Sequence, residues 1–276
     1  MANHIPIHTF NEKNHIISFN KICLSNERMF YPAHRHDFYE LVFFTEGNGT
    51  HRIDFTDYPI APNRIYFLSP GQIHEMKSQG RKGYVIAFSK EILYHIQTIE
   101  NLSFSQLFHH PENRYSIDIS SGNESAFHTL ILLLENETSR TIENKNLIRN
   151  YLSALLISAL EYSPYIEKDK LKDRIMKLSL EINKSFITER SGSYYANKLS
   201  ISLKHLNDIT NETLGKTVTQ LIHERIILEA KREIAYTGKT IKEIAYELDF
   251  KDPAYFNRFF KKFMNMTPEE FRKNSK

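Results

Sequence analysis

The sequence predicts a multidomain protein of the α+β class, in which an antiparallel β-barrel with flanking helices precedes an all-helical C-terminal domain. Strand-like segments separated by turn residues occupy the chain up to Phe88, and apolar residues at helical spacing follow from Glu124 to Tyr162. Beyond this point strand signals are absent, and one helical pattern occurs twice. The predicted division is 1–163 for the first domain, 164–172 for a linker and 173–276 for the second domain.

Composition and length limit the classes of protein to which the chain can belong. The 276 residues are 41% apolar and 25% charged, which suffices for packed domains and excludes a broadly disordered chain. A single cysteine excludes a disulfide within the chain. We expect a cytoplasmic protein without membrane contact, because the N-terminus lacks a secretory pattern and no apolar run approaches the about 20 residues of a membrane span.

Short segments rich in β-branched and aromatic residues predict the strands of the first domain. They are Tyr39–Phe44, Ile65–Leu68 and Gly83–Phe88. Turn residues occupy stretches between and beside them, namely Glu46–Gly49, Ala61–Asn63 and Ser69–Gly71. Short strands with such turns favour an antiparallel barrel or sandwich.

Two antiparallel helices are predicted after the strands, one containing Phe127 to Leu134 and the other Leu147 to Leu160. The second helix carries apolar residues on a broad face. That face can cover the sheet or form the seam of a homodimer. Both interpretations stay open, and they are compatible with one another.

Charge is distributed unevenly, although the net charge of the chain is only +3. Residues 168–276 contain 22 Lys and Arg against 15 Asp and Glu, a net charge of +7, whereas the rest of the chain carries −4. A basic domain attracts polyanions, because neutralised phosphates release condensed counterions. The C-terminal domain therefore favours a nucleic-acid partner.

The C-terminal domain contains one pattern twice. Residues 196–201 (ANKLSI) match residues 245–250 (AYELDF) in the alanine, the leucine and the apolar residue after the turn. Further on, Leu206-Asn207 corresponds to Phe256-Asn257. In each copy a small alanine lets the first helix pack closely on the second, which is the helix–turn–helix pattern.

Capping residues support this interpretation. Ser202 is the predicted N-cap of the second helix in the first copy, and Asp252-Pro253 supplies an N-cap followed by proline at the first helical position in the second copy. Asp249, Gly215 and Asn265 are residue types that tolerate a left-handed backbone at a turn or helix end.

One long amphipathic helix is predicted between the copies, from Val218 to Tyr236. A helix of about 18 residues spans about 27 Å. This length is near one turn of a duplex, about 34 Å. Two recognition helices held in this way can enter successive major grooves on one face of DNA.

The segment TIKEIAYELDFKDPAYFNRFFKKFMNMTPEEFR, Thr240–Arg272, resembles the signature of AraC/XylS-type transcriptional regulators. The resemblance covers the C-terminal domain and implies two helix–turn–helix units joined by a long helix, with RNA polymerase as a partner and activation as the usual outcome. Glycines usual in that family are Asp249 and Asn265 here, and both substitutes tolerate a positive φ. Asp208 and Thr210 replace a basic and an aromatic residue, which implies weaker DNA reading by the first recognition helix.

Outward residues of the two recognition helices are the predicted DNA contacts. In the first helix they are Leu203, Lys204, Asn207 and Asp208. In the second they are Ala254, Tyr255, Asn257 and Arg258, with Lys261 and Lys262 nearer the phosphates. Arginine binds guanine and asparagine binds adenine through paired hydrogen bonds. A phosphate contact or an internal ion pair is the alternative for Arg258, and the neighbouring phenylalanines are expected in the core.

The first domain contains a spacing of histidines that resembles the cupin barrel motif, with His34, His36 and Glu40 followed by His74. Residues two apart on a strand share a face, so His34 and His36 point the same way. Three imidazoles and a carboxylate can hold a divalent transition metal. The alternative function is therefore a cupin-type metal-dependent enzyme with an appended DNA-binding domain.

AraC-type regulators commonly keep such a barrel as an effector-sensing domain whose histidines work without metal, and the resemblance therefore implies no metal, cofactor or catalytic residue. The expected effector-binding residues are His34, His36, Glu40, Phe44, Tyr66 and His74. The whole pattern predicts a transcriptional regulator whose affinity for double-stranded DNA changes when a small-molecule effector binds the barrel. An architectural DNA-binding protein would not need the sensor-like first half.

Overall fold

The computed structural model describes residues 6–9, 17–25, 29–100, 104–108, 115–119, 124–162 and 170–275. The chain divides into two compact units, one of residues Pro6–Glu167 and one that contains Lys168–Lys276. Residues 163–169, most of the predicted linker, lie outside the described residues, and a helix begins at Lys170. Among the described helices, none is both long and apolar enough to cross a membrane.

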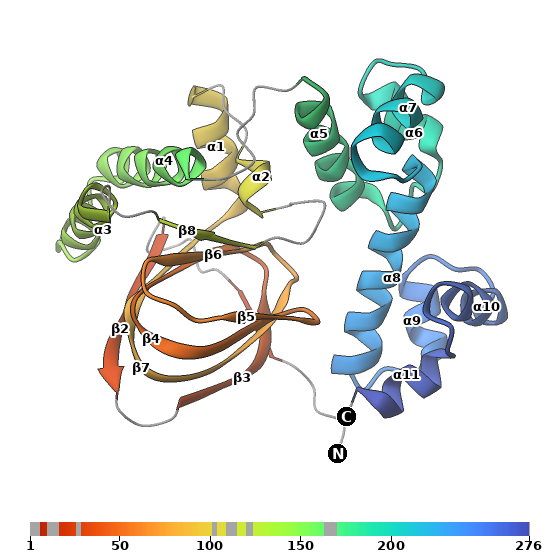
Figure 1. Cartoon of the computed structure of the whole chain (residues 1–276), viewed down its shortest axis with the longest axis horizontal. Coiled ribbons are helices and arrows are strands. Elements are labelled where there is room, and N and C mark those ends of the chain that lie inside the picture. Colours follow the sequence, from red (N-terminus) through yellow and green to blue (C-terminus); the bar gives the residue numbers. More distant parts are fainter. Residues whose placement is uncertain are drawn as a thin grey trace. The chain divides into compact units, whose positions relative to one another are not determined.

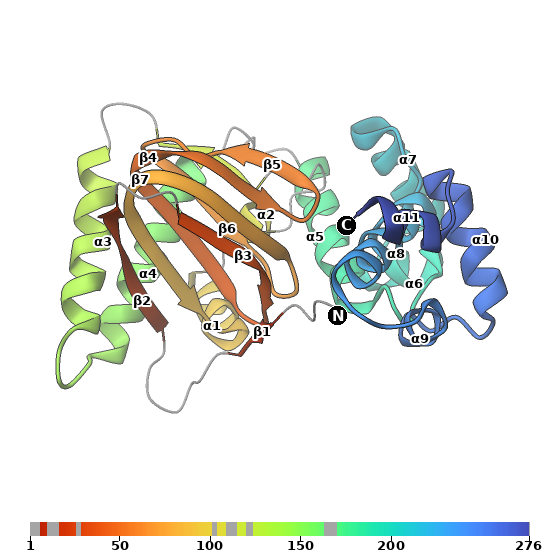
Figure 2. The ribbon, with the colours of Figure 1, turned by 90° about the horizontal axis from the view of Figure 1, so that it is seen from below.

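An antiparallel sheet curves into a barrel in the first unit (Figure 1, Figure 2). Its strands are β1 (Ile7–His8), β2 (Ile17–Ser25), β3 (Met29–His36), β4 (Tyr39–Ile53), β5 (Thr56–Pro59), β6 (Arg64–Leu68), β7 (Ile73–Phe88) and β8 (Ser116–Asp118). Neighbouring strands follow the order β1-β3-β7-β4-β6-β8, with β2 paired to β7 and β5 to β4. The short β1 is parallel to β3, and the other pairs are antiparallel.

Alternation along β4 divides the apolar side chains of the first unit between two cores. Leu41 and Phe43 belong to a core that includes residues of the flanking helices, whereas Val42 and Phe44 belong to a separate cluster. The second cluster fills the inside of the barrel, because successive side chains of a strand point to opposite faces of the sheet. The three predicted strands are confirmed within β4, β6 and β7.

One predicted turn is wrong. Glu46–Gly49 lies within the continuous strand β4, where the register with β7 shifts twice between Phe44 and Asn48. Gly47 (φ 122°) and Gly49 (φ 126°) adopt backbone conformations that L side chains rarely reach, and they allow these bulges. The glycine-rich stretch therefore marks a bulged strand. The other two predicted turns are confirmed, with left-handed residues at Asn63 and Gly71.

Helices pack against the outer face of the sheet (Figure 1). They are α1 (Lys90–Glu100), α2 (Ser105–Phe108), α3 (Glu124–Thr138) and α4 (Lys145–Glu161). The predicted helix pair is confirmed by α3 and α4, and the apolar face of α4 covers the sheet through residues such as Leu152, Leu155 and Leu156. On α3, Leu132 and Leu133 stay exposed.

The described residues of the second unit form helices and their connections without a strand, as predicted. Its helices are α5 (Lys170–Ser185), α6 (Gly192–Lys198), α7 (Leu203–Leu214), α8 (Val218–Tyr236), α9 (Ile241–Glu247), α10 (Pro253–Met264) and α11 (Pro268–Asn274). The long helix α8 has the bounds that the sequence predicts, and its N-terminus is closed by a capping box between Thr217 and Gln220. Its apolar residues, such as Ile222 and Ile226, form the centre of one core.

A buried ion-pair network stabilises the middle of α8. Glu229 Oε2 lies 2.9 Å from Arg225 Nη1 and 3.0 Å from Arg232 Nη1. Arg225 also donates from Nε to Asn183 of α5 and stacks on Phe186, which ties α5 to α8. Burial raises the pKa of Glu229, but the two guanidinium groups outweigh this effect and bring the pKa to about 2.

Candidate nucleic-acid interface and barrel site

The two helix–turn–helix units have the same local geometry. The units α6–α7 and α9–α10 lie towards opposite ends of α8 (Figure 1). Ile201 N donates to Ala196 O at 3.1 Å in the first unit, and Phe250 N donates to Ala245 O at 2.9 Å in the second. The repeat seen in the sequence is therefore a repeat of structure.

The predicted turn and cap chemistry is confirmed in both units. Asp249 (φ 57°) is left-handed in the second turn, as predicted, and Ser200, for which no prediction was made, takes the same conformation (φ 56°) in the first turn. The side chain of Ser202 accepts from His205 N, and that of Asp252 accepts from Ala254 N and Tyr255 N. Gly215 and Asn265 end α7 and α10 in the left-handed conformation.

The outer face of α10 is exposed and basic. The predicted contacts on this helix are all exposed, namely Ala254, Tyr255, Asn257, Arg258, Lys261 and Lys262. The opposite face buries Phe256 and Phe260 completely. Arg258 Nη2 lies 3.8 Å from Asp252 Oδ2, but both side chains are mostly exposed, so this internal pair is weak and leaves the guanidinium accessible to a phosphate or a base.

The outer face of α7 offers less positive charge. Lys204 and Asp208 are exposed, and Glu212 adds a second acidic group. The predicted contact Leu203 is instead partly buried against the helical core. The predicted contact Asn207 is half-buried, and its Oδ1 accepts a hydrogen bond of 3.0 Å from Val218 N at the start of α8. These two side chains serve the fold in this structure.

Asn257 occupies the matching position in the second unit, but its environment differs. The residue that corresponds to Val218 is Pro268, the first residue of α11. Proline has no N–H to donate. The bond that holds Asn207 therefore cannot form in the second unit, and the Asn257 side chain is exposed on the outer face of α10.

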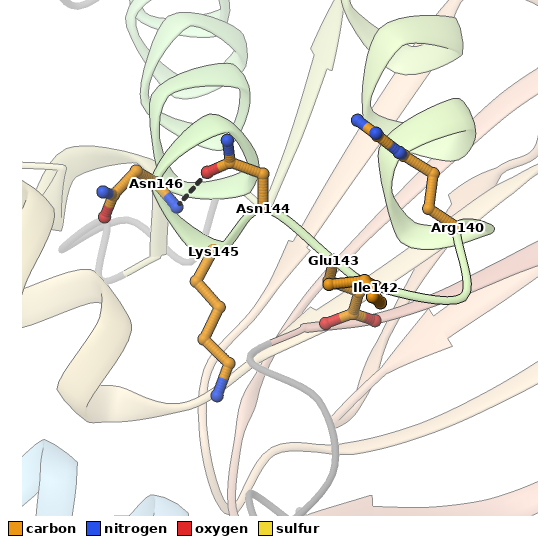
Figure 3. A pocket seen from close by; sticks show the side chains of 6 residues that line it. All are labelled: Arg140, Ile142, Glu143, Asn144, Lys145 and Asn146. Carbon is orange, nitrogen blue, oxygen red and sulfur yellow. Dashed lines mark hydrogen bonds between the residues drawn. The ribbon is translucent and has the colours of Figure 1, made fainter.

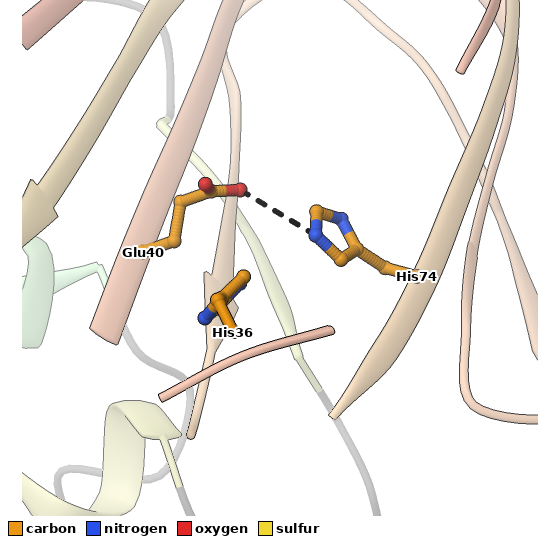
Figure 4. Close-up of side chains that lie close together, drawn as sticks. All are labelled: His36, Glu40 and His74. Atoms are coloured by element: carbon orange, nitrogen blue, oxygen red, sulfur yellow. Dashed lines mark ion pairs between the residues drawn. The ribbon is translucent and has the colours of Figure 1, made fainter. Parts of the chain in front are cut away.

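A cluster of histidines and one carboxylate lies in the barrel. His36 ends β3, Glu40 lies at the start of β4, and His74 lies at the start of β7 opposite His34 in the register. Side chains of His36, Glu40 and His74 offer ligand atoms within 4.8 Å of one another, and all three residues are buried (Figure 4). Glu40 Oε1 lies 3.9 Å from His74 Nε2. We call these three residues the barrel triad.

Hydrogen bonds and burial set the protonation of the cluster. His36 Nδ1 lies 2.7 Å from the Phe38 carbonyl oxygen, which accepts only, so Nδ1 carries the proton. His74 Nδ1 lies 3.1 Å from His51 Nε2. Burial lowers the pKa of His36 to about 4 and that of His51 to about 3, and it raises the pKa of Glu40 to about 7.

The structure divides the predicted effector-binding residues into two neighbouring groups. His34 is half-buried, with its ring centroid 4.1 Å from that of His74, and so belongs with the barrel triad. Phe44 and Tyr66 belong to the apolar cluster inside the barrel. His51, which sequence reasoning missed, connects the groups, because its ring centroid lies 4.8 Å from Tyr66 and 5.4 Å from His74.

A shallow depression also lies at the turn between α3 and α4 (Figure 3). It is lined by Arg140, Ile142, Glu143, Asn144, Lys145 and Asn146. Asn144 Oδ1 is occupied as the N-cap of α4, accepting from Asn146 N and Leu147 N. Asn144 therefore serves to cap α4, and the candidate sites are the outer face of α10 and the barrel.

Comparison with known proteins assigns both units. Residues 195–274 match the family described as a helix-turn-helix domain. Residues 20–140 match the AraC-like ligand binding domain. The chain belongs to the AraC family of transcriptional regulators. This AraC-family protein is thus a DNA-binding regulator with a ligand-binding domain of the cupin-like type.

Relatives align with this AraC-family regulator over most of both chains. An uncharacterized HTH-type transcriptional regulator, YfiF of Bacillus subtilis, is 24% identical over 87% of this chain and 78% of its own length. The HTH-type transcriptional activator RhaR of Enterobacter sp. is 23% identical over 89% of this chain and 88% of its own. Among solved structures, ToxT from Vibrio cholerae has a TM-score of 0.47 and 18% identity, over 94% of this chain and 98% of that one.

Proposed function

We propose that this regulator recognises specific promoter sequences mainly through α10, with α7 in a supporting role, and that a small molecule in the barrel changes its affinity for DNA. The observation that carries the proposal is the pair of equivalent helix–turn–helix units at the two ends of α8. With 19 residues, α8 is about 28 Å long, near the spacing of successive major grooves.

We assign different contributions to the two recognition helices because they expose different charges and because their side chains have different roles. The exposed face of α10 carries Arg258, Lys261 and Lys262, whereas that of α7 carries Lys204 with Asp208 and Glu212. Basic residues supply the phosphate contacts that dominate affinity. We therefore assign most of the binding energy to the second unit.

The proposal also covers the partners of the protein and its effect on transcription. Relatives named as transcriptional activators support activation of transcription. For this activation we propose contact with RNA polymerase. The exposed Leu132 and Leu133 on α3 support a homodimer through the first unit. We also propose that the protein acts in the cytoplasm. We favour a regulator over the cupin-type enzyme, because both matched domains belong to regulators.

The proposed function is tested by selecting bound sequences from a random DNA pool and titrating the selected site with variants in a gel-shift assay. Arg258→Ala is expected to weaken binding about 5- to 150-fold, because a two-pronged arginine contact contributes about 1–3 kcal/mol. Lys204→Ala is expected to cost less and to reduce the salt dependence by about one phosphate contact.

Lys145→Ala removes the same charge from the exposed surface of the first unit and serves as the matched control. It should leave the affinity unchanged. If Arg258→Ala binds the selected site as tightly as Lys145→Ala, the assignment of α10 is wrong. A pool that yields no preferred sequence would contradict sequence-specific recognition itself.

Asn207 and Asn257 occupy equivalent positions, but we expect Asn207 to contribute to stability and Asn257 to DNA binding. Asn207→Ala should lower the free energy of unfolding by about 1 kcal/mol, because it removes the acceptor that caps α8, with a small effect on DNA affinity. Asn257→Ala should leave stability unchanged and weaken DNA binding about tenfold, the loss of one good base contact. Thermal unfolding and gel-shift titration of both variants give the comparison, and equal behaviour in both assays would contradict it.

A further inference from the structure

We propose that the barrel triad of His36, Glu40 and His74 binds one divalent transition-metal ion. Two imidazoles and one carboxylate form a ligand set that suits zinc, iron, manganese, cobalt or nickel. The three side chains come from different strands, and Figure 4 shows them converging on a common point. The proposal goes beyond the regulator's action on DNA and concerns the barrel alone.

The first argument for a metal site is the position of the ligand atoms. The ligand atoms of the triad already lie within 4.8 Å of one another. Ligands that share an ion at about 2.0–2.2 Å lie about 3 Å apart. Glu40 Oε1 already lies 3.9 Å from His74 Nε2, within about 1 Å of that spacing.

The second argument for a metal site is the hydrogen bonding of the imidazole rings. His36 Nδ1 donates to the Phe38 carbonyl oxygen, so Nε2 of this ring is a lone pair. His36 Nε2 and His74 Nε2 are both buried and have no hydrogen-bond partner among the described residues. Buried polar atoms in folded proteins are normally paired. A metal ion satisfies both nitrogens together.

His51 supplies the support that a ligating histidine usually has. When His74 coordinates through Nε2, its Nδ1–H donates to His51 Nε2 at 3.1 Å. A partner of this kind fixes the ring orientation of the ligand and raises its basicity. His51 is fully buried. It is therefore a positioning residue for the site, while the triad supplies the ligands.

Metal binding to the full-length chain tests the proposal. The protein is stripped with a chelator, dialysed and titrated with Zn²⁺ and, separately, with Co²⁺, whose absorption spectrum reports its ligands. We expect one ion per chain. His36→Ala, Glu40→Gln and His74→Ala should each weaken binding by more than about tenfold, and His51→Phe should weaken it about 10- to 100-fold with a changed Co²⁺ spectrum.

Control variants separate loss of ligands from loss of fold. His95→Ala removes an exposed histidine from α1 of the same unit and should bind like the natural protein. His74→Cys keeps a metal ligand, and should retain binding and add a thiolate-to-cobalt absorption band. Thermal unfolding of each variant shows whether it folds.

Three outcomes overturn the proposal: substoichiometric metal in the natural protein, binding unaffected by both His36→Ala and His74→Ala, or a His74→Cys cobalt complex without the thiolate band. A gel-shift titration of the stripped protein is the separate check of the proposed function. If one of these three outcomes occurs while the stripped protein still binds DNA, the metal site is refuted and the proposed function stands.

Discussion

Replacing Glu229 by glutamine is expected to lower the free energy of unfolding of the helical unit by about 3 kcal/mol at neutral pH. The carboxylate faces two guanidinium groups, and the side chains of Arg232 and Arg225 are only 3% and 17% exposed. Removing one member of a buried ion-pair network leaves charge that burial has separated from water. The lowered pKa of Glu229, about 2 against an ordinary 4.5, corresponds to a similar energy.

This contribution also predicts how stability changes with pH. Because the folded-state pKa lies below the unfolded one, the stabilisation is complete above about pH 4.5 and is lost as the pH falls towards 2. Chemical unfolding at several pH values measures it. The natural protein should lose more stability over this window than Glu229→Gln does.

Glu224→Gln is the matched control, because Glu224 lies on the same helix but pairs with Lys216 at the exposed surface. Such pairs contribute about 1 kcal/mol or less. If the two glutamine variants lose equal stability, the network does not contribute in the way proposed here.

Replacing Gly49 by alanine is expected to destabilise the barrel by about 3 kcal/mol or more. The residue has a φ of 126°, and an added Cβ would overlap the carbonyl oxygen of Lys77 and lie 2.8 Å from Ser78 Cα. Both obstacles are backbone atoms of the paired strand β7, so no side chain can move aside. Chemical unfolding of the barrel measures the loss.

Gly71→Ala separates the two causes of strain. Gly71 also has a positive φ, 82°, but nothing lies within 4 Å of an added Cβ. Its cost should therefore be limited to the backbone conformation, about 1 kcal/mol. A Gly49→Ala variant as stable as Gly71→Ala would show that β4 can shift away from β7 at the bulge.

The helical unit could be predicted from sequence because its signals are local. Caps at Ser202 and Asp252, left-handed residues such as Asp249 and the uninterrupted apolar period of α8 each depend on neighbours within a few positions. The helix pair α3–α4 was predictable for the same reason. In the barrel, β7 extends from Ile73 to Phe88, and the sequence pattern predicts only its last residues, because the earlier part lacks regular alternation.

The barrel site was predictable in part. The spacing of His34, His36, Glu40 and His74 predicts a cluster, and the structure brings these residues together. His51 was missed because it follows the bulges of β4. Strict alternation from Phe44 would place His51 on the opposite face, since the two are an odd number of residues apart, and the shifts in register restore it to the inside.

The sequence repeat also did not predict that Asn257 and Asn207 differ in their hydrogen bonding. The repeat aligns Asn257 with Asn207 and gives both the same predicted role. Only the hydrogen bond from Val218 N, and the proline that stands at the matching place in the second unit, distinguish them. The two asparagines differ because the hydrogen-bond donor lies about a dozen positions further along the chain, and because a proline at that position has no N–H.

The continuous helix α8 fixes rotation as well as distance. Each residue of an α-helix advances about 1.5 Å and turns about 100°. One inserted residue would therefore leave the spacing of the two units almost unchanged while swinging α10 through more than a quarter of a circle relative to α7. Among chains with this architecture, tolerated changes in the length of this helix should come in near-whole turns.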